Sequence, residues 1–276
     1  GAAIKLLESD IDNIAIYEKS DGIGGTWHEN RYPGAACDVP SHLYCYSFAP
    51  NPDWSHVYAR QPEIKEYLEN IVNDYELMPY VNFSVKVTDL ILDEVSGLWE
   101  VHLANNDIIQ AHHVIHGGGG LHQPFIPDFN GLTKFDGEVM HTAQWRDEVE
   151  LNDKNVVVIG SAASAIQVIP EIAKIAKTLN VFQRTPNYII PRGDKKYTSA
   201  QQQRFAKYPL LLKLYRWFIF IRMELIAFPI VKKDSKIGLL QTKIKLLLWR
   251  ERRRAQAIPD VLRCCRRTKI CCKIGG

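Results

Sequence analysis

The sequence predicts an α/β fold built around parallel strands, because apolar strands and amphipathic helices alternate along much of the chain. The clearest example is the order strand, glycine-containing turn, helix and strand, formed by residues 155–159, 164–177 and 179–182. A strand–helix–strand connection of this kind pairs its two strands in parallel. Short alternating runs between residues 81 and 115 predict a small inserted β element, and helical spacing from Ser199 onward predicts a C-terminal helical subdomain.

The bulk composition is that of an ordinary globular protein. The chain has 276 residues, of which 46% are hydrophobic and 24% charged. This length suits one large or two medium domains. A formal net charge of +3 gives no reason to expect a nucleic-acid partner, and the arginine-rich run at 250–254 is predicted to be a solvated helix face.

The six cysteines do not have the pattern of a disulfide scaffold. Cys37 and Cys45 are far in sequence from the pairs 264–265 and 271–272. Those pairs lack the spacing of thiolate metal ligands, and no partnered histidines follow them. We therefore predict reduced thiols, no metal site and a cytoplasmic location.

The N-terminal part of the chain predicts a helix, a strand and a second helix. Residues 2–7 have helical character, and the apolar run 14–17 predicts a strand that ends at Glu18. A glycine-rich turn follows at 22–25. Residues 63–75 carry apolar side chains near helical spacing, which predicts the second helix.

Further along, residues 85–87, 98–103 and 114–115 are predicted strands. The stretch 210–231 is apolar enough to raise the question of a membrane span. Four charged side chains interrupt this stretch: Lys213, Arg216, Arg222 and Glu224. No run of about 18 uncharged residues remains, so we predict a helical subdomain rather than a span. Association with a membrane surface stays open.

The turn of the strand–helix–strand unit has the pattern of a phosphate-binding loop. Residues 160–165 read Gly-Ser-Ala-Ala-Ser-Ala, a version of G-x-G-x-x-G/A with Ala162 at the middle glycine. Glycine at that position lets the backbone approach a pyrophosphate, and alanine adds one methyl group. The following helix offers backbone N–H groups to a phosphate. The unit is therefore predicted to be Rossmann-like.

Arg184 and Thr185 follow the second strand of this unit, within the usual reach of the motif. An acidic residue here would bind the ribose hydroxyls of NAD, whereas a guanidinium suits the 2′-phosphate of NADP. We predict the NADP-binding role for Arg184. The alternative is an exposed arginine without a ligand.

Glu18 has the position of the acid that receives a ribose hydroxyl in a Rossmann unit. The matching glycine fingerprint is expected about 20 residues earlier, which is upstream of Gly1. An exposed acid at a strand end is the alternative interpretation. The glycine, aromatic and acidic residues that follow Glu18 favour the cofactor-binding role.

Two segments resemble signatures of the Baeyer–Villiger monooxygenase family. Residues 24–27, 30–34 and Asp38 resemble its GGTW…NxYPGxxxD segment, and residues 135–145 resemble its fingerprint F-x-G-x-x-x-H-x-x-x-W. The resemblance runs from Gly1 to about residue 192 and continues more loosely beyond it. Departures from the family pattern are Ala162, Arg146 and the pair His116-Gly117.

The resemblance implies two Rossmann-like dinucleotide-binding domains. It implies FAD binding in 1–130, an interdomain linker with the fingerprint in 131–150, partial NADP binding in 151–198, and a helical subdomain and tail in 199–276. The residues implied to contact FAD are Glu18, Gly24, Gly25, Thr26, Trp27, Asp38, Tyr44 and Val87. Those implied to contact NADPH are Ala36, Cys37, Asp38, Gly160, Ser161, Ala162, Ala163, Ser164, Ala165, Ile166, Gln167, Arg184 and Thr185.

The resemblance further implies an enzyme that uses FAD, NADPH and O2 to insert an oxygen atom into a ketone. Asp38 and His141 are the implied catalytic candidates. In the family the acid matching Asp38 pairs with a catalytic arginine, a role that we assign to no arginine of this sequence. His141 is predicted to act as a hinge or gate between the domains, or simply to hold its loop. The alternatives are a flavin enzyme that oxygenates nitrogen or sulfur, and a non-catalytic fragment.

Overall fold

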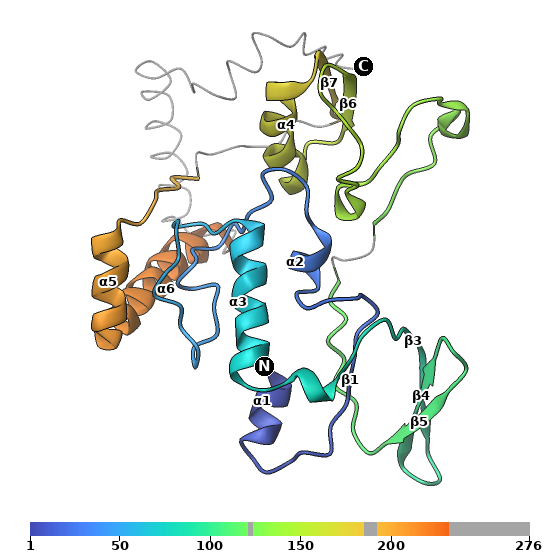
Figure 1. The fold of residues 1–276 in the computed structure, drawn as a ribbon, viewed down its shortest axis with the longest axis vertical. Coiled ribbons are helices and arrows are strands. Elements are labelled where there is room, and N and C mark those ends of the chain that lie inside the picture. Colours follow the sequence, from blue (N-terminus) through green and yellow to red (C-terminus); the bar gives the residue numbers. More distant parts are fainter. Residues whose placement is uncertain (121–123, 185–191, 232–276) are drawn as a thin grey trace. The chain divides into compact units, whose positions relative to one another are not determined.

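The computed structural model describes residues 1–120, 124–184 and 192–231 (Figure 1). Thr185, the arginine-rich run and the paired cysteines 264–265 and 271–272 lie outside the described residues. The chain forms two compact units. The first unit comprises Gly1–Arg31 and Gln61–Trp145, and the second comprises Tyr32–Arg60 and Arg146–Gly276. Tyr32–Arg60, which lies inside the predicted FAD-binding range, thus groups with the second unit.

The first unit contains a short parallel strand pair and the helix predicted at 63–75. Its elements are α1 (Ala2–Leu7), β1 (Ile16–Tyr17), α2 (Thr26–Glu29), α3 (Gln61–Asp74) and β2 (Val81–Asn82). Strands β1 and β2 pair in parallel, with Ile16 opposite Val81. Helix α3 buries Ile64, Tyr67 and Ile71, whose spacing places them on one helical face. The helix predicted at 2–7 is also confirmed.

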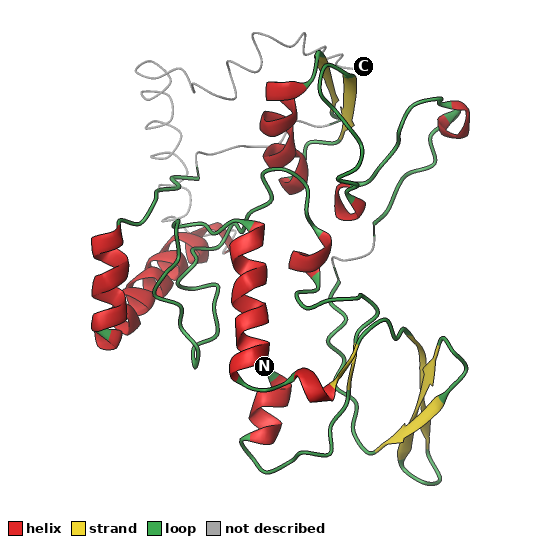
Figure 2. Ribbon diagram, viewed as in Figure 1, coloured by secondary structure: helices red, strands yellow, loops and turns green. Residues whose placement is uncertain are grey.

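The inserted β element is a three-stranded antiparallel sheet in the order β3-β4-β5 (Figure 2). Its strands are β3 (Val87–Asp93), β4 (Leu98–Leu103) and β5 (Ile108–Ala111). The strand predicted at 98–103 is confirmed, but Val114-Ile115 have no regular structure, so that prediction is wrong. The reason is packing: Ile115 is 65% exposed and the chain continues into four glycines, so the run lacks a sheet face to cover.

The second unit contains the predicted strand–helix–strand arrangement. Its elements are β6 (Asn155–Ile159), α4 (Ala163–Ile175) and β7 (Thr178–Phe182). Strands β6 and β7 pair in parallel, with Asn155 opposite Thr178 and Ile159 opposite Phe182. Helix α4 buries Ala165, Val168 and Ile172, again on one helical face. The parallel α/β arrangement predicted from hydrophobic periodicity is therefore present.

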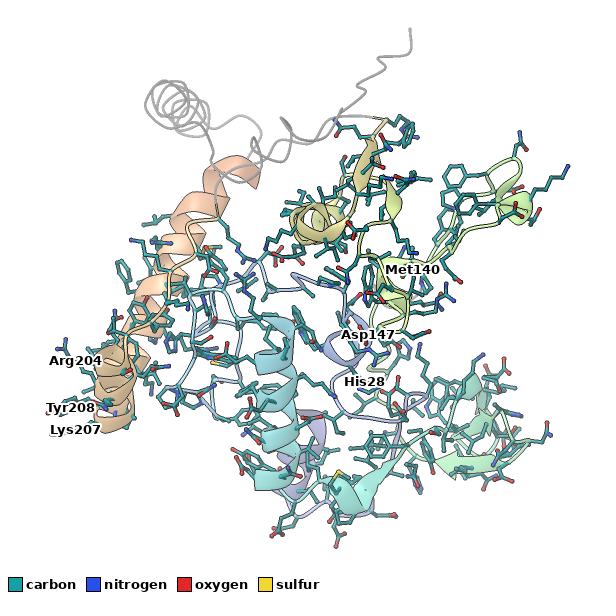
Figure 3. All side chains as sticks on the ribbon, turned by 45° about the horizontal axis from the view of Figure 1, so that its top comes forward. His28, Met140, Asp147, Arg204, Lys207 and Tyr208 are labelled. Atoms are coloured by element: carbon teal, nitrogen blue, oxygen red, sulfur yellow. The ribbon has the colours of Figure 1, made fainter. Side chains whose placement is uncertain are left out.

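Two further helices, α5 (Ser199–Lys207) and α6 (Pro209–Val231), confirm the beginning of the predicted helical segment. Thr198 caps α5 through a capping box with Gln201. At the end of α5, Lys207 Nζ lies 5.4 Å from the centre of the Tyr208 ring (Figure 3). Within the described residues, no helix is both long enough and apolar enough to cross a membrane.

His42 lies in an aromatic cluster that joins α5 and α6 to the loop before α3. Its ring centre is 5.0 Å from that of Tyr197, 4.9 Å from Phe205 and 5.5 Å from Tyr215. The side chain is 1% exposed, and neither ring nitrogen has a hydrogen-bond partner among the described residues. Burial lowers the pKa of His42 from 6.5 to about 4.

We expect this histidine to make the stability of the protein depend on pH. In the unfolded chain His42 becomes protonated below about pH 6.5, whereas in the folded chain it becomes protonated only below about pH 4. The free energy of unfolding therefore falls as the pH falls from 6.5 to about 4. The loss approaches about 3 kcal/mol. His42→Phe keeps an aromatic ring and should flatten this slope in urea unfolding at several pH values. The exposed control His113→Phe should keep it, and parallel slopes for wild type and His42→Phe would contradict the assignment.

Candidate cofactor-binding site

The turn between β6 and α4 has the backbone conformation of a phosphate-binding loop. Gly160 has φ +109°, which favours glycine, and its N–H donates to the Phe182 carbonyl at 2.8 Å. Ala162 is the N-cap of α4 with φ −78° and ψ −170°, an extended conformation that any residue adopts. No side chain caps this helix, so the N–H groups of its first turn are available to an anion. The turn therefore fits a pyrophosphate, and alanine at the middle position introduces no backbone strain.

Arg184 lies at the same sheet edge as this turn. Because Ile159 pairs with Phe182 in the parallel register, the carboxyl ends of β6 and β7 are side by side. Arg184 follows β7 by two residues and is exposed. A guanidinium at this edge can meet the 2′-phosphate of a nucleotide whose pyrophosphate lies on the turn.

Gln167 on α4 contacts a loop from another part of the second unit. Its Nε2 donates to the Ala36 carbonyl at 2.8 Å, and its Oε1 accepts from the Ala36 N–H at 3.3 Å. The Tyr32 hydroxyl donates to the same Oε1 at 2.9 Å. The carboxamide thus joins the loop to α4, and the contact of Gln167 with NADPH that the resemblance implies stays a prediction.

The same loop requires glycine at position 34. Gly34 has φ +83°, and a Cβ atom there would lie 2.6 Å from the Gln167 carbonyl oxygen. A side chain would thus be strained by the backbone conformation and would collide with α4. Gly34 and Gln167 together hold the loop directly against the dinucleotide-binding helix.

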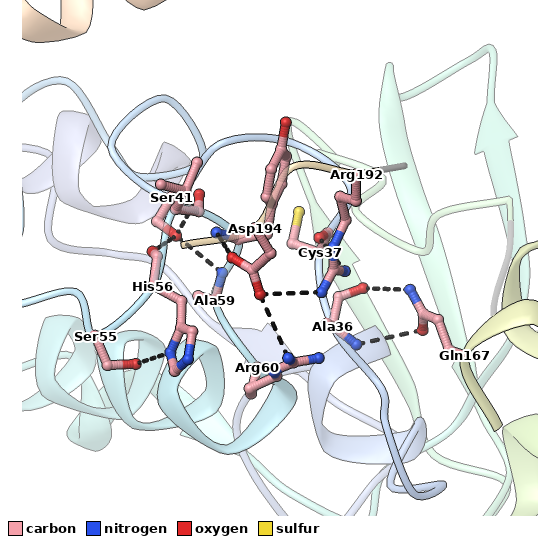
Figure 4. A network of polar contacts seen from close by, with 12 residues as sticks. Ala36, Cys37, Ser41, Ser55, His56, Ala59, Arg60, Gln167, Arg192 and Asp194 are labelled. Atoms are coloured by element: carbon pink, nitrogen blue, oxygen red, sulfur yellow. Dashed lines mark hydrogen bonds and ion pairs between the residues drawn. The ribbon is translucent and has the colours of Figure 1, made fainter. Parts of the chain in front are cut away.

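The loop leads into a buried segment that contains Ala36 and Cys37 (Figure 4). Asp38, which follows this segment, is exposed. Ala36 and Cys37 are buried, and the Cys37 N–H donates to the Ala59 carbonyl at 3.0 Å. Arg192 Nη1 donates to the Cys37 carbonyl at 3.3 Å. Burial raises the pKa of the Cys37 thiol above its ordinary value, so the thiol stays protonated at neutral pH. The backbone is therefore fixed up to the residue whose carboxylate faces solvent.

In the first unit, Glu18 and the glycine-rich turn lie at the end of β1. Glu18 Oε1 accepts the Ser20 N–H at 2.8 Å, which orients the carboxylate. Gly24 and Gly25 have φ +125° and +51° and lead into α2. The Gln61 side chain donates to the Trp27 carbonyl, which joins α2 to α3. A strand-end acid beside a tight glycine turn fits the ribose and phosphate groups of a dinucleotide.

Next to this turn the first unit has a polar hollow of about 320 Å³ that the sequence did not indicate. Two polar pairs line it, a hydrogen bond between His28 Nε2 and Asp21 Oδ1 at 2.9 Å and an ion pair between Lys19 Nζ and Glu29 Oε1 at 3.0 Å. Trp145 of the fingerprint segment also lines the hollow. No pattern in the sequence shows these pairings, because they depend on the path of the turn.

Three further predicted residues, His141, Val87 and Tyr44, differ in their contacts and in their exposure to solvent. His141 Nδ1 accepts the Ala143 N–H at 3.1 Å and so caps the 3₁₀ turn Thr142–Gln144 of the fingerprint. This contact supports the interpretation that His141 holds its loop. Val87 begins β3 and is half-buried, and Tyr44 is exposed.

The predicted residues are thus divided between the two units. The first unit holds Glu18, Gly24, Gly25, Thr26, Trp27, Val87 and His141. The second holds Ala36, Cys37, Asp38, Tyr44, Arg184 and the turn at 160–167. In the second unit the structure brings Ala36 and Gln167 together. The sequence did not indicate the contributions of Tyr32 and Arg192; the glycine at position 34 was the one visible sign of a close approach.

Comparison with known proteins gives consistent matches. A family model described as flavin-binding monooxygenase-like matches residues 2–211. A Baeyer–Villiger monooxygenase of Pseudomonas aeruginosa is 42% identical over 224 residues, covering 81% of this chain and 42% of the relative. One from Streptomyces coelicolor is 36% identical over 241 residues, covering 87% of this chain and 46% of the relative.

Solved structures give the same result. An oxidised steroid monooxygenase bound to NADP matches with a TM-score of 0.69 and 39% identity, covering 74% of this chain and 40% of that chain. Cyclohexanone monooxygenase from Rhodococcus sp. Phi1 bound to NADP+ matches with a TM-score of 0.69 and 38% identity, covering 74% and 39%. The chain spans less than half the length of the relatives it matches.

The contact between Gln167 and the loop leads to a stability prediction. Gln167→Ala removes three hydrogen bonds and leaves the buried Ala36 backbone groups unpaired, so the free energy of unfolding should fall by about 1–3 kcal/mol. Lys174→Ala on the same helix removes an exposed pair with Glu171 and should cost about 0.5 kcal/mol or less. Denaturant unfolding of both variants checks this. Equal losses would show that Gln167 does not hold the loop.

Proposed function

The chain belongs to the flavin-binding monooxygenase-like family, and on that premise we propose that it acts as an NADPH- and FAD-dependent monooxygenase. Its substrate is a small ketone, into which it inserts an oxygen atom from O2. The observation that carries this proposal is the shared edge of β6 and β7, where an uncapped helix N-terminus and Arg184 lie together. The Baeyer–Villiger monooxygenases among its relatives and the fingerprint at 135–145 support the same chemistry.

The NADPH site is formed by residues of the second unit. The turn at 160–165 and the first turn of α4 hold the pyrophosphate through backbone N–H groups. Arg184 and Thr185 bind the 2′-phosphate, Arg184 through charged hydrogen bonds. Gln167 keeps the segment Ala36–Asp38 against α4.

The FAD site draws on the strand-end acid and the glycine turn of the first unit. Glu18 binds ribose hydroxyls, and the segment Gly24–Trp27 and Val87 approach the cofactor. FAD, when bound, supplies the redox and oxygen chemistry. Asp38 presents an exposed carboxylate on a fixed backbone, which suits a group that must hold a cation in place. His141 contributes by holding the fingerprint loop.

The architecture and location follow from the same proposal. The two parallel strand pairs support two Rossmann-like domains, the first binding FAD and the second NADP, with residues 131–150 as their linker. Cys37 and Cys45 form no disulfide, which favours the cytoplasm.

The proposal is tested by incubating the purified protein with FAD, NADPH, O2 and a panel of cyclic and linear ketones. We expect NADPH oxidation to reduce the flavin and ester or lactone to form. A flavin that NADPH does not reduce would refute the proposal. Oxygenated amines or sulfides without any ester would assign the other branch of flavin monooxygenases.

Arg184 should determine which nicotinamide nucleotide the protein prefers. Its guanidinium contributes about 1.5–3 kcal/mol through charged hydrogen bonds to the 2′-phosphate. Arg184→Ala should therefore weaken NADPH binding by roughly tenfold to a hundredfold and leave NADH binding unchanged. Titration of both nucleotides measures this, with the exposed Lys177→Ala as the control for loss of one positive charge. Equal affinities of the wild type for NADPH and NADH would contradict the assignment.

A further inference from the structure

Three segments of the second unit that are far apart in sequence lie side by side around Asp194 (Figure 4). The segment 192–197 pairs with residues 55–60: the Val57 N–H donates to the Lys195 carbonyl at 2.9 Å, and the Tyr197 N–H to the Ser55 carbonyl at 2.8 Å. Residues 55–60 pair in turn with 36–41, through the Cys37 N–H and the Ala59 carbonyl. The segment 192–197 is thereby connected to the backbone that carries Asp38.

Asp194 is the acceptor at the centre of this arrangement. Its Oδ1 accepts the Tyr58 N–H at 3.2 Å. Its Oδ2 accepts from Arg60 Nη2 at 3.3 Å and from Arg192 Nη2 at 3.4 Å. The Asp194 side chain is 17% exposed, so the two guanidinium groups are needed to compensate a largely desolvated charge.

Arg192 connects Asp194 to the backbone before Asp38 by binding both. While Nη2 pairs with Asp194, Nη1 donates to the Cys37 carbonyl at 3.3 Å. The Tyr58 ring lies 5.3 Å below the guanidinium and restricts its plane. Since the Cys37 carbonyl belongs to the peptide that links Cys37 to Asp38, Arg192 sets the orientation of that peptide.

The Asp38 side chain itself has no hydrogen bond or ion pair to the described residues. Its direction therefore depends on the backbone, and the backbone depends on the contacts of Cys37 with Ala59 and Arg192. Among the described residues, the hydrogen bonds of Asp194 go to Tyr58, Arg60 and Arg192, and none goes to the turn at 160–165 or to Arg184. The contacts proposed for the pyrophosphate and the 2′-phosphate are thus separate from those that orient the peptide before Asp38.

We propose that Asp194, acting through Arg192 and together with Arg60, is a positioning residue that sets the direction of the catalytic Asp38 carboxylate. The inference rests on the proposed function. Productive turnover consumes NADPH, a proton, O2 and a ketone and yields NADP+, ester and water. When Asp38 is displaced, NADPH, a proton and O2 yield NADP+ and hydrogen peroxide instead. Asp194 thus governs how many molecules of ester form per molecule of NADPH oxidised.

The test measures ester and hydrogen peroxide formed per NADPH consumed, the KM for NADPH and the melting temperature. Asp194→Ala should lower the yield of ester per NADPH by about tenfold, because a small displacement of a reacting group is costly. The KM for NADPH should change by less than about twofold, since the proposed contacts with the pyrophosphate and the 2′-phosphate, at the turn 160–165 and at Arg184, are left in place. The matched control is Lys196→Ala. The Lys196 side chain is exposed, and this residue pairs with His56 through its backbone.

Two milder variants keep the test decisive if Asp194→Ala does not fold. Asp194→Asn keeps an acceptor for the Tyr58 N–H but loses the charge, and should give an intermediate yield of ester. Arg192→Lys keeps the charge but cannot span both Asp194 and the Cys37 carbonyl with a fork of donors, and should resemble Asp194→Ala.

A wild-type yield of ester in the folded variants would overturn the inference while leaving the proposed function intact. A raised KM for NADPH with an unchanged yield would also overturn it, because Asp194 would then serve nucleotide binding. A wild-type protein whose bound flavin NADPH does not reduce would refute the proposed function itself, and the inference with it.

Discussion

The second unit depends on one side chain that satisfies the backbone of a distant loop. The Gln167 carboxamide pairs with both the N–H and the carbonyl of Ala36. A buried peptide group needs such partners, because an unpaired one costs about 1–3 kcal/mol. Gly34 permits the close approach, since any side chain there would collide with α4. The loop and the dinucleotide-binding helix consequently form one structural element.

On its other side the same segment is held by charge. Arg192 reaches the Cys37 carbonyl while Asp194 and the Tyr58 ring fix the guanidinium. The segment Ala36–Cys37 is therefore held from two directions, and the exposed carboxylate of Asp38 follows immediately. A rigid backbone that ends in an accessible acid is what a preorganised site requires.

The local structure was largely predictable from the sequence, and the long-range contacts were not. Helix α4 and strands β6 and β7 follow from apolar periodicity and the glycine turn, which are properties of neighbouring residues. The strand expected at Val114-Ile115 failed, because an apolar pair forms a strand only where a sheet accepts it. The pairs of Gln167 with Ala36 and Asp194 with Arg60 join residues 131 and 134 positions apart, and no local pattern announces them.

Hydrogen bonds hold the backbone at Ala36 and Cys37 from two sides and should make it rigid, while Asp38 beyond it is accessible. Amide hydrogen exchange in the native protein tests this most directly. We expect the Ala36 and Cys37 N–H groups to exchange as slowly as those of β6. Exchange as fast as that of Phe125, which is 78% exposed and lies in a segment without regular structure, would contradict this expectation.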